Sequence, residues 1–182
     1  MQDLLAKEGS VQACIAHAGT RKEVVPYMAA GVTVRTGIEG DDATRWLAMQ
    51  ASELAVDERT PVTYVTRRGH LGNVTRAFIE VIDHHWVDAE AKQAPASECV
   101  SRVLAVLDGA PLDVGEMQDF VLSDLRTLVR RRRRVGAGHQ VLILDLPVAV
   151  GTDRPDGLGC YALAGLNALS REGVHIITVQ QG

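Results

Sequence analysis

Short runs of β-branched and apolar residues alternate along this chain with longer stretches whose apolar residues recur every three or four positions. The short runs predict strands and the longer stretches predict helices. Strands are expected at 32–36, 61–66, 103–107, 141–145 and 174–179. Helices are expected at 44–55, 71–82, 88–101, 113–134 and 161–171. This alternation is typical of an α/β fold, in which helices flank a mainly parallel sheet.

The first thirty residues have a less regular pattern. Residues 11–16 fit a short strand, and residues 22–30 fit a segment that leads into the strand at 32–36. We therefore expect residues 1–30 to form an N-terminal segment. Residues 31–182 are expected to form a single α/β domain, since their number suits one hydrophobic core.

The composition predicts a globular protein of the cytoplasm. The chain has 182 residues, of which 46% are hydrophobic, and its net charge of −4 argues against a surface that binds nucleic acid generally. No apolar run approaches the roughly 20 residues of a membrane span, and the first twenty residues lack a signal-peptide pattern. The three cysteines lack C-x-x-C spacing, so we interpret them as reduced thiols.

Residues 37–44 have the frame of a phosphate-binding loop. Such a loop reads G-x-x-x-x-G-K-[ST], lies between a strand and a helix, and surrounds phosphates with backbone N–H groups. Gly37 and Thr44 are in register with the first and last positions, and Gly40 lies between them. Asp42, however, stands where the second glycine belongs, and Ala43 stands where the lysine belongs.

Together with the order of the other elements, this frame resembles the RecA-like motor domain of DnaB-type replicative helicases. In that family the loop is followed by a Pro-Val strand, by a strand and a basic helix, by an apolar strand that ends in aspartate, and by a strand that ends near a nucleotide-sensing glutamine. The corresponding segments here are 37–44, 61–68, 103–134, 141–145 and 174–181. The resemblance covers roughly residues 25–182. It implies a three-layer P-loop NTPase fold with a central, mainly parallel sheet.

The departures from the family weaken the implied nucleotide site. Ala43 cannot neutralise phosphate charge, and Glu39, Asp41 and Asp42 place three carboxylates where an anion would bind. A carboxylate–phosphate pair at ~4 Å costs about 1 kcal/mol in water and about 4 kcal/mol near a protein surface. The helix dipole offers only about 0.3–1 kcal/mol per charge in return. We therefore expect no cofactor, with ATP and magnesium bound only if the altered loop still accepts them.

The resemblance also implies that hydrolysis is lost. The family's catalytic glutamate corresponds to Arg68 or Arg67, and an arginine cannot act as a base at neutral pH. Three matching residues remain, namely Thr44, Asp145 and Gln181. Asp145 and Gln181 are the catalytic candidates if the domain is active.

Plainer interpretations of the same residues stay open. Residues 37–44 fit a strand-to-helix turn in which the Asp42 carboxylate caps the helix. The alternative is an altered phosphate loop in which Gly37, Gly40 and Thr44 bind the cofactor. Asp145 ends a strand, where α/β proteins place functional groups, but it also fits a hydrogen-bonded residue of the core.

Arginines form the strongest basic cluster, at the end of the helix expected at 113–134. One interpretation is a solvated helix end, which the helix dipole favours. The other is a contact with DNA phosphates or with an acidic partner. The candidate DNA-binding residues are Arg126, Arg130, Arg131, Arg133 and Arg134.

Asp83, His84 and His85 resemble the signature of the DHH phosphoesterases, which bind manganese, and Asp88 could add a ligand. That family also needs a D-x-D motif upstream, which this chain lacks. Adjacent histidines at a helix end also fit side chains that face solvent.

These observations favour a RecA-like domain that does not hydrolyse ATP and acts as an interaction or regulatory module. Its expected partner is a second copy of itself or a protein of the helicase or recombinase type. The resemblance implies a setting in DNA replication or mobile-element maintenance. The alternatives are a nucleotide-dependent helicase-like ATPase with an altered loop, a metal-dependent phosphoesterase, and DNA binding through the arginine run.

Overall fold

The computed structural model of the chain describes residues 15–16, 30–87, 96–118, 121–133, 140–148 and 158–180. Within these residues six strands form one parallel sheet in the order β1-β2-β6-β5-β3-β4. The strands are β1 (Ile15–Ala16), β2 (Gly31–Arg35), β3 (Val62–Arg67), β4 (Leu112–Met117), β5 (Gln140–Val148) and β6 (Val174–Gln180). The helices are α1 (Gly40–Ser52), which continues into the π-helical segment η1 (Glu53–Asp57), α2 (Leu71–His85), α3 (Ala96–Leu107), α4 (Leu122–Arg133) and α5 (Leu158–Ser170).

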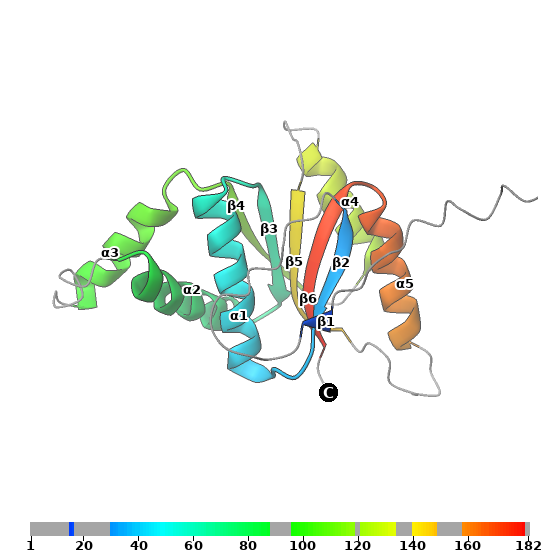
Figure 1. Ribbon diagram of the computed structural model, residues 1–182, viewed down its shortest axis with the longest axis horizontal. Coiled ribbons are helices and arrows are strands. Elements are labelled where there is room, and N and C mark those ends of the chain that lie inside the picture. The colour runs from blue at the N-terminus through cyan, green and yellow to red at the C-terminus, as the bar shows by residue number, and fades with distance from the viewer. Residues whose placement is uncertain are drawn as a thin grey trace, which may run out of the picture.

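The helices cover both faces of the sheet, as Figure 1 shows, with α1, α2 and α3 on one side and α4 and α5 on the other. Side chains that alternate along β5 separate the two cores. Val141 and Ile143 pack with α1 and α2, whereas Leu142 and Leu144 pack with α4 and α5. The expected three-layer α/β architecture is therefore confirmed, and the apolar strand at 141–145 is buried on both faces.

The sheet order brings the strand-to-helix loop at 36–39 close to the end of β5. Strand β6 lies between β2 and β5, and all three run in the same direction, so their carboxyl ends share one edge of the sheet. Helix α1 begins at that edge and packs against β5 and β6. Ligands of open α/β sheets bind in this position.

The expected strand at 103–107 is wrong, because these residues belong to helix α3. Val103 is buried and Val106 is partly buried, whereas Leu104 between them is 61% exposed. With Cys99, which is also partly buried, these residues have helical spacing and form the side of α3 that packs on α2. The helix expected at 88–101 begins at Ala96 among the described residues, and residues 88–95 lie outside them.

The helix expected at 113–134 is also wrong in its first part. Residues 112–117 form strand β4, which pairs in parallel with β3 from Val62–Leu112 to Arg67–Met117. Helix α4 begins only at Leu122 and buries Leu125 and Val129. Cross-strand pairing at the sheet edge decides the conformation of β4, against a weak helical spacing in the sequence.

The N-terminal segment expected at 1–30 is described only at residues 15–16 and 30. Ile15 and Ala16 pair in parallel with Val34 and Arg35, so these two residues belong to the sheet. None of the helices among the described residues has the length and apolar character that a membrane span requires.

Candidate functional site

Asp145 lies on β5 at the carboxyl edge of the sheet, and hydroxyl groups surround its carboxylate. Thr44 Oγ1 donates to Asp145 Oδ2 at 3.1 Å and lies 3.3 Å from Oδ1. Tyr64 Oη donates to Oδ2 at 3.0 Å, and Thr66 Oγ1 lies 3.5 Å from the same oxygen. The structure therefore brings together Thr44 and Asp145, two candidates that are 101 residues apart in the sequence.

A pocket of about 160 Å³ opens beside this carboxylate. Its wall comes from the start of α1, the ends of β3, β5 and β6, and the start of α2. The lining residues are Gly40, Asp41, Ala43, Thr44, Leu47, Arg67, His70, Asn73, Leu144, Asp145 and Val179. Of the candidate residues, Gly40, Thr44 and Asp145 line this pocket, whereas Gly37 is not part of its lining.

The segment at 37–44 differs from a phosphate loop because α1 begins at Gly40, well before Thr44. Gly37 (φ +77°) and Gly40 (φ +55°) have the left-handed backbone that favours glycine and make the turn into the helix. The Ala43 N–H donates to the Glu39 carbonyl at 3.4 Å, so the helix uses a donor that a phosphate loop leaves for its ligand. Ala43 itself is only 4% exposed and packs in the core.

Asp42 does not cap α1, so that interpretation is wrong. Glu39 is the N-cap residue, without a side-chain cap, and Asp42 lies in the first turn. The Asp42 side chain is 76% exposed and pairs with Arg45 Nη1 at 3.1 Å. Of the three acidic residues around the loop, only Asp41 lines the pocket.

Arg67 and Arg68 lie where the family's catalytic glutamate is expected, and the structure separates them. Arg67 ends β3 and lines the pocket. Arg68 Nη1 donates to Gln118 Oε1 at 3.3 Å, just beyond the end of β4, and Arg68 is absent from the pocket lining. The pocket therefore contains a guanidinium group as well as the Asp41 and Asp145 carboxylates.

Burial raises the pKa of the Asp145 carboxyl above its usual range. The hydrogen bonds from Tyr64, Thr44 and Thr66 and the nearby His70 lower this pKa, but desolvation outweighs them. Burial also raises the pKa of Tyr64 far above its usual value, so the phenol keeps its proton and remains a donor.

The raised pKa of Asp145 predicts a pH-dependent effect of Asp145→Asn. A carboxyl whose folded pKa exceeds its unfolded value of roughly 3.9 stabilises the fold below that value and loses this contribution as pH rises through the folded pKa. Asparagine does not titrate. We therefore expect the stability of Asp145→Asn relative to wild type to increase as pH rises from about 4 to 7. Urea unfolding of both proteins across this range measures it, and a relative stability that is flat or falls would contradict the assignment.

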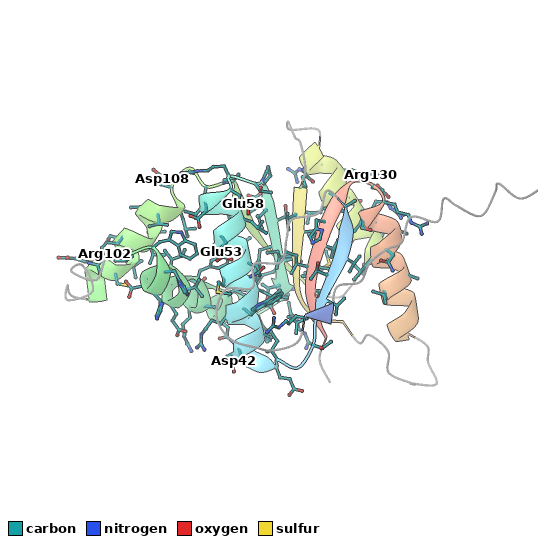
Figure 2. All side chains as sticks on the ribbon, in the orientation of Figure 1. Asp42, Glu53, Glu58, Arg102, Asp108 and Arg130 are labelled. Carbon is teal, nitrogen blue, oxygen red and sulfur yellow. The ribbon has the colours of Figure 1, made fainter. Side chains whose placement is uncertain are left out.

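The arginine cluster lies at the opposite edge of the sheet from the pocket. Helix α4 ends before β5 begins, and Glu172 lies just before β6, so both are at the amino ends of the strands. Figure 2 shows Arg130 at the upper right of the molecule and Asp42 at its bottom. Glu172 accepts from Arg126 Nε at 2.7 Å and from Arg130 Nε at 3.3 Å, which partly neutralises both. Arg131 is exposed, whereas the Arg133 side chain and Arg134 lie outside the described residues.

The residues of the DHH-like motif have other contacts. Cys99 Sγ donates to Asp83 Oδ1 at 3.3 Å, and Arg102 Nη2 lies 3.9 Å from the same oxygen. The rings of His84 and His85 are 4.7 Å apart and exposed at the end of α2. Among the described residues, no group of three His, Cys, Asp or Glu side chains could hold a metal ion. Asp88 and the candidate Gln181 lie outside the described residues.

Sequence reasoning missed several residues of the pocket. Tyr64 and Thr66 are two positions apart on β3, so both side chains point to the same face of the sheet. The alternation of side chains along a strand could have identified this pair from the sequence. His70 and Asn73 come from the start of α2. No pattern in the sequence marks them, because only the sheet order brings α2 next to α1.

Comparisons with known proteins agree with this architecture. No protein-family model matches the chain, and no curated protein matches it. Among solved structures, the ATPase domain of G40P matches with a TM-score of 0.65 at 14% identity, over 85% of this chain and 58% of that chain. A DnaB-like replicative helicase, described with its interactions with primase, matches with a TM-score of 0.61 at 15% identity, over 82% of this chain and 39% of that chain. The chain thus has the RecA-like fold of these helicase domains and spans less than two thirds of either protein.

Proposed function

We propose that this chain is a RecA-like, helicase-type domain that does not hydrolyse ATP and acts through contacts with other proteins. The observation that carries the proposal is the conformation of residues 37–44. A phosphate loop needs free backbone N–H groups and a lysine at its end. Here α1 has already begun at Gly40, and the position of the lysine holds a buried alanine, Ala43.

The residues around Asp145 support the same proposal. In the active site of a nucleotide hydrolase, residues at the positions of Thr44 and Asp145 would help to hold magnesium beside the phosphates. In this chain Asp145 Oδ2 already accepts hydrogen bonds from Thr44 and Tyr64. A magnesium ion would have to compete with these donors for the carboxylate, which supports the proposal that no magnesium–ATP complex binds here.

At the position of the family's catalytic glutamate, this chain has no base for attack by water. Arg67 lines the pocket from the end of β3, where a catalytic glutamate would activate the water molecule. A guanidinium stays protonated at neutral pH and cannot accept that proton. A domain without the phosphate-binding loop and the catalytic base keeps only the fold of a helicase motor. Its function must then come from that fold.

We infer that this architecture serves assembly. RecA-like domains with the fold of helicase motors present surfaces for neighbouring subunits, and a domain that keeps the fold without the chemistry can still use them. The partner would be a second copy of the chain or a helicase- or recombinase-type protein. DNA replication or mobile-element maintenance, as an accessory factor or inhibitor, is the setting that the shared fold suggests.

Calorimetric titration with ATP, with and without magnesium, tests the proposal alongside a phosphate-release assay. We expect no magnesium-dependent binding heat and no hydrolysis above the level of Asp145→Ala. Arg131→Gln, at an exposed position distant from the pocket, is the matched control and should behave as wild type. Magnesium-dependent hydrolysis that Asp145→Ala abolishes would overturn the proposal.

That outcome would instead favour an ATPase with an altered loop, the second candidate. One observation supports it, namely that Thr44 and Asp145 meet at the carboxyl edge of the sheet beside a pocket. The arginine cluster gives less support to DNA binding, because Glu172 pairs with Arg126 and Arg130.

A further inference from the structure

Arg35 is a charged residue that the fold encloses. It is the last residue of β2, pairs in register with Ala16 and Val179, and is only 8% exposed. Its guanidinium carbon lies 5.3 Å from the centre of the Trp46 ring on α1. The side chain is therefore held between the sheet and the helix that follows the 36–39 loop.

The charge of Arg35 lacks a counter-ion among the described residues. A guanidinium remains protonated in proteins, and a buried charge is costly unless it is paired. None of the ion pairs within the described ranges includes Arg35, and its Nε is enclosed without a hydrogen-bond acceptor. The contact with Trp46 compensates only part of this cost, because cation–π attraction is weaker than the loss of hydration.

The position and shape of the group indicate what would pair with it. Arg35 lies at the carboxyl edge of the parallel sheet, where α/β folds bind their ligands. A guanidinium presents parallel N–H donors that match two oxygens of a phosphate group. Arg35 is absent from the lining of the Asp145 pocket, but its register partner Val179 belongs to that lining, so the two positions are neighbours on one edge of the sheet.

We infer that Arg35 is the receptor for a phosphate-type oxyanion, either free phosphate or the phosphate of a small metabolite. The Arg35 guanidinium would hold two oxygens of the anion, and the Trp46 ring would keep the guanidinium in place. The inference does not depend on the absence of ATP hydrolysis, which concerns Thr44 and Asp145.

Thermal unfolding with increasing inorganic phosphate, at ionic strength held constant with chloride, tests the inference. For wild type we expect Tm to rise by roughly 3–6 °C when phosphate exceeds its Kd tenfold. Arg35→Gln should lose the rise, and Arg171→Gln, which removes an exposed arginine just after α5, should keep it. No rise in wild type, or an equal rise in Arg35→Gln, would overturn the inference.

A second variant keeps the test valid if Arg35→Gln fails to fold. Arg35→Lys keeps the charge but loses the paired donors and most of the stacking on Trp46. Wild type should broaden the ³¹P resonance of inorganic phosphate more than Arg35→Lys does, and equal broadening would count against the inference.

Adenosine monophosphate in place of phosphate distinguishes the two sources, because a larger Tm rise at equal concentration indicates a phosphorylated metabolite.

Discussion

Replacing Ile143 with alanine is expected to lower the free energy of unfolding by about 2–5 kcal/mol, because it removes buried methyl groups and leaves a cavity. Ile143 is fully buried on β5, at the centre of the sheet, and packs in the core under α1 and α2. Urea unfolding with an unchanged m-value measures the loss.

The matched control is Val114→Ala on β4. Val114 is 40% exposed on the last strand of the sheet, so its truncation should change stability by no more than about 0.5 kcal/mol. Equal losses for the two variants would show that β5 is not the central strand of the core. Since Asp145 lies two residues after Ile143, that result would also remove the basis for the candidate site.

Replacing Tyr64 with phenylalanine is expected to cost about 1–3 kcal/mol, because the carboxylate of Asp145 loses a hydrogen bond in a partly buried site. The phenol donates to Asp145 Oδ2 at 3.0 Å, while the ring packs edge-to-face on Phe78 with centroids 5.5 Å apart. Phenylalanine keeps the ring contact, so the variant isolates the hydroxyl group.

A double-mutant cycle with Asp145→Ala separates this bond from other effects of the substitution. If Tyr64 and Asp145 interact directly, the cost of Tyr64→Phe should fall well below its wild-type value once Asp145 is absent. Strictly additive losses would argue against the hydrogen bond and against the closed arrangement around Asp145.

The segment at 37–44 shows which features a sequence motif predicts correctly and which it does not. The register of Gly37 and Thr44 predicted a strand-to-helix connection. Thr44, on α1, does donate a hydrogen bond to Asp145 at the carboxyl edge of the sheet. The same register placed Ala43 at the end of a loop. The helix instead begins at Gly40 and turns Ala43 into the core. The start of a helix depends on backbone hydrogen bonds that a motif alone does not define.

The two errors in secondary structure have one physical origin. Residues 103–107 form a short apolar run, and residues 112–117 mix apolar with polar residues; neither pattern distinguishes a helix from a strand. Packing on α2 makes the first run helical, and pairing with β3 makes the second a strand. Neither contact is local, so neither could be read from the residues of the run itself.

The sequence by itself determined the parallel α/β architecture, because strand β5 is apolar enough to require helices on both faces. It also motivates the proposal that the domain does not hydrolyse ATP, since Ala43 and Arg67 cannot replace a lysine and a glutamate. Only the tertiary structure decided which polar groups meet. Tyr64, Thr66 and Thr44 surround Asp145, and Arg35 remains enclosed without a described counter-ion, because strand order and helix packing place residues together that are distant in the chain.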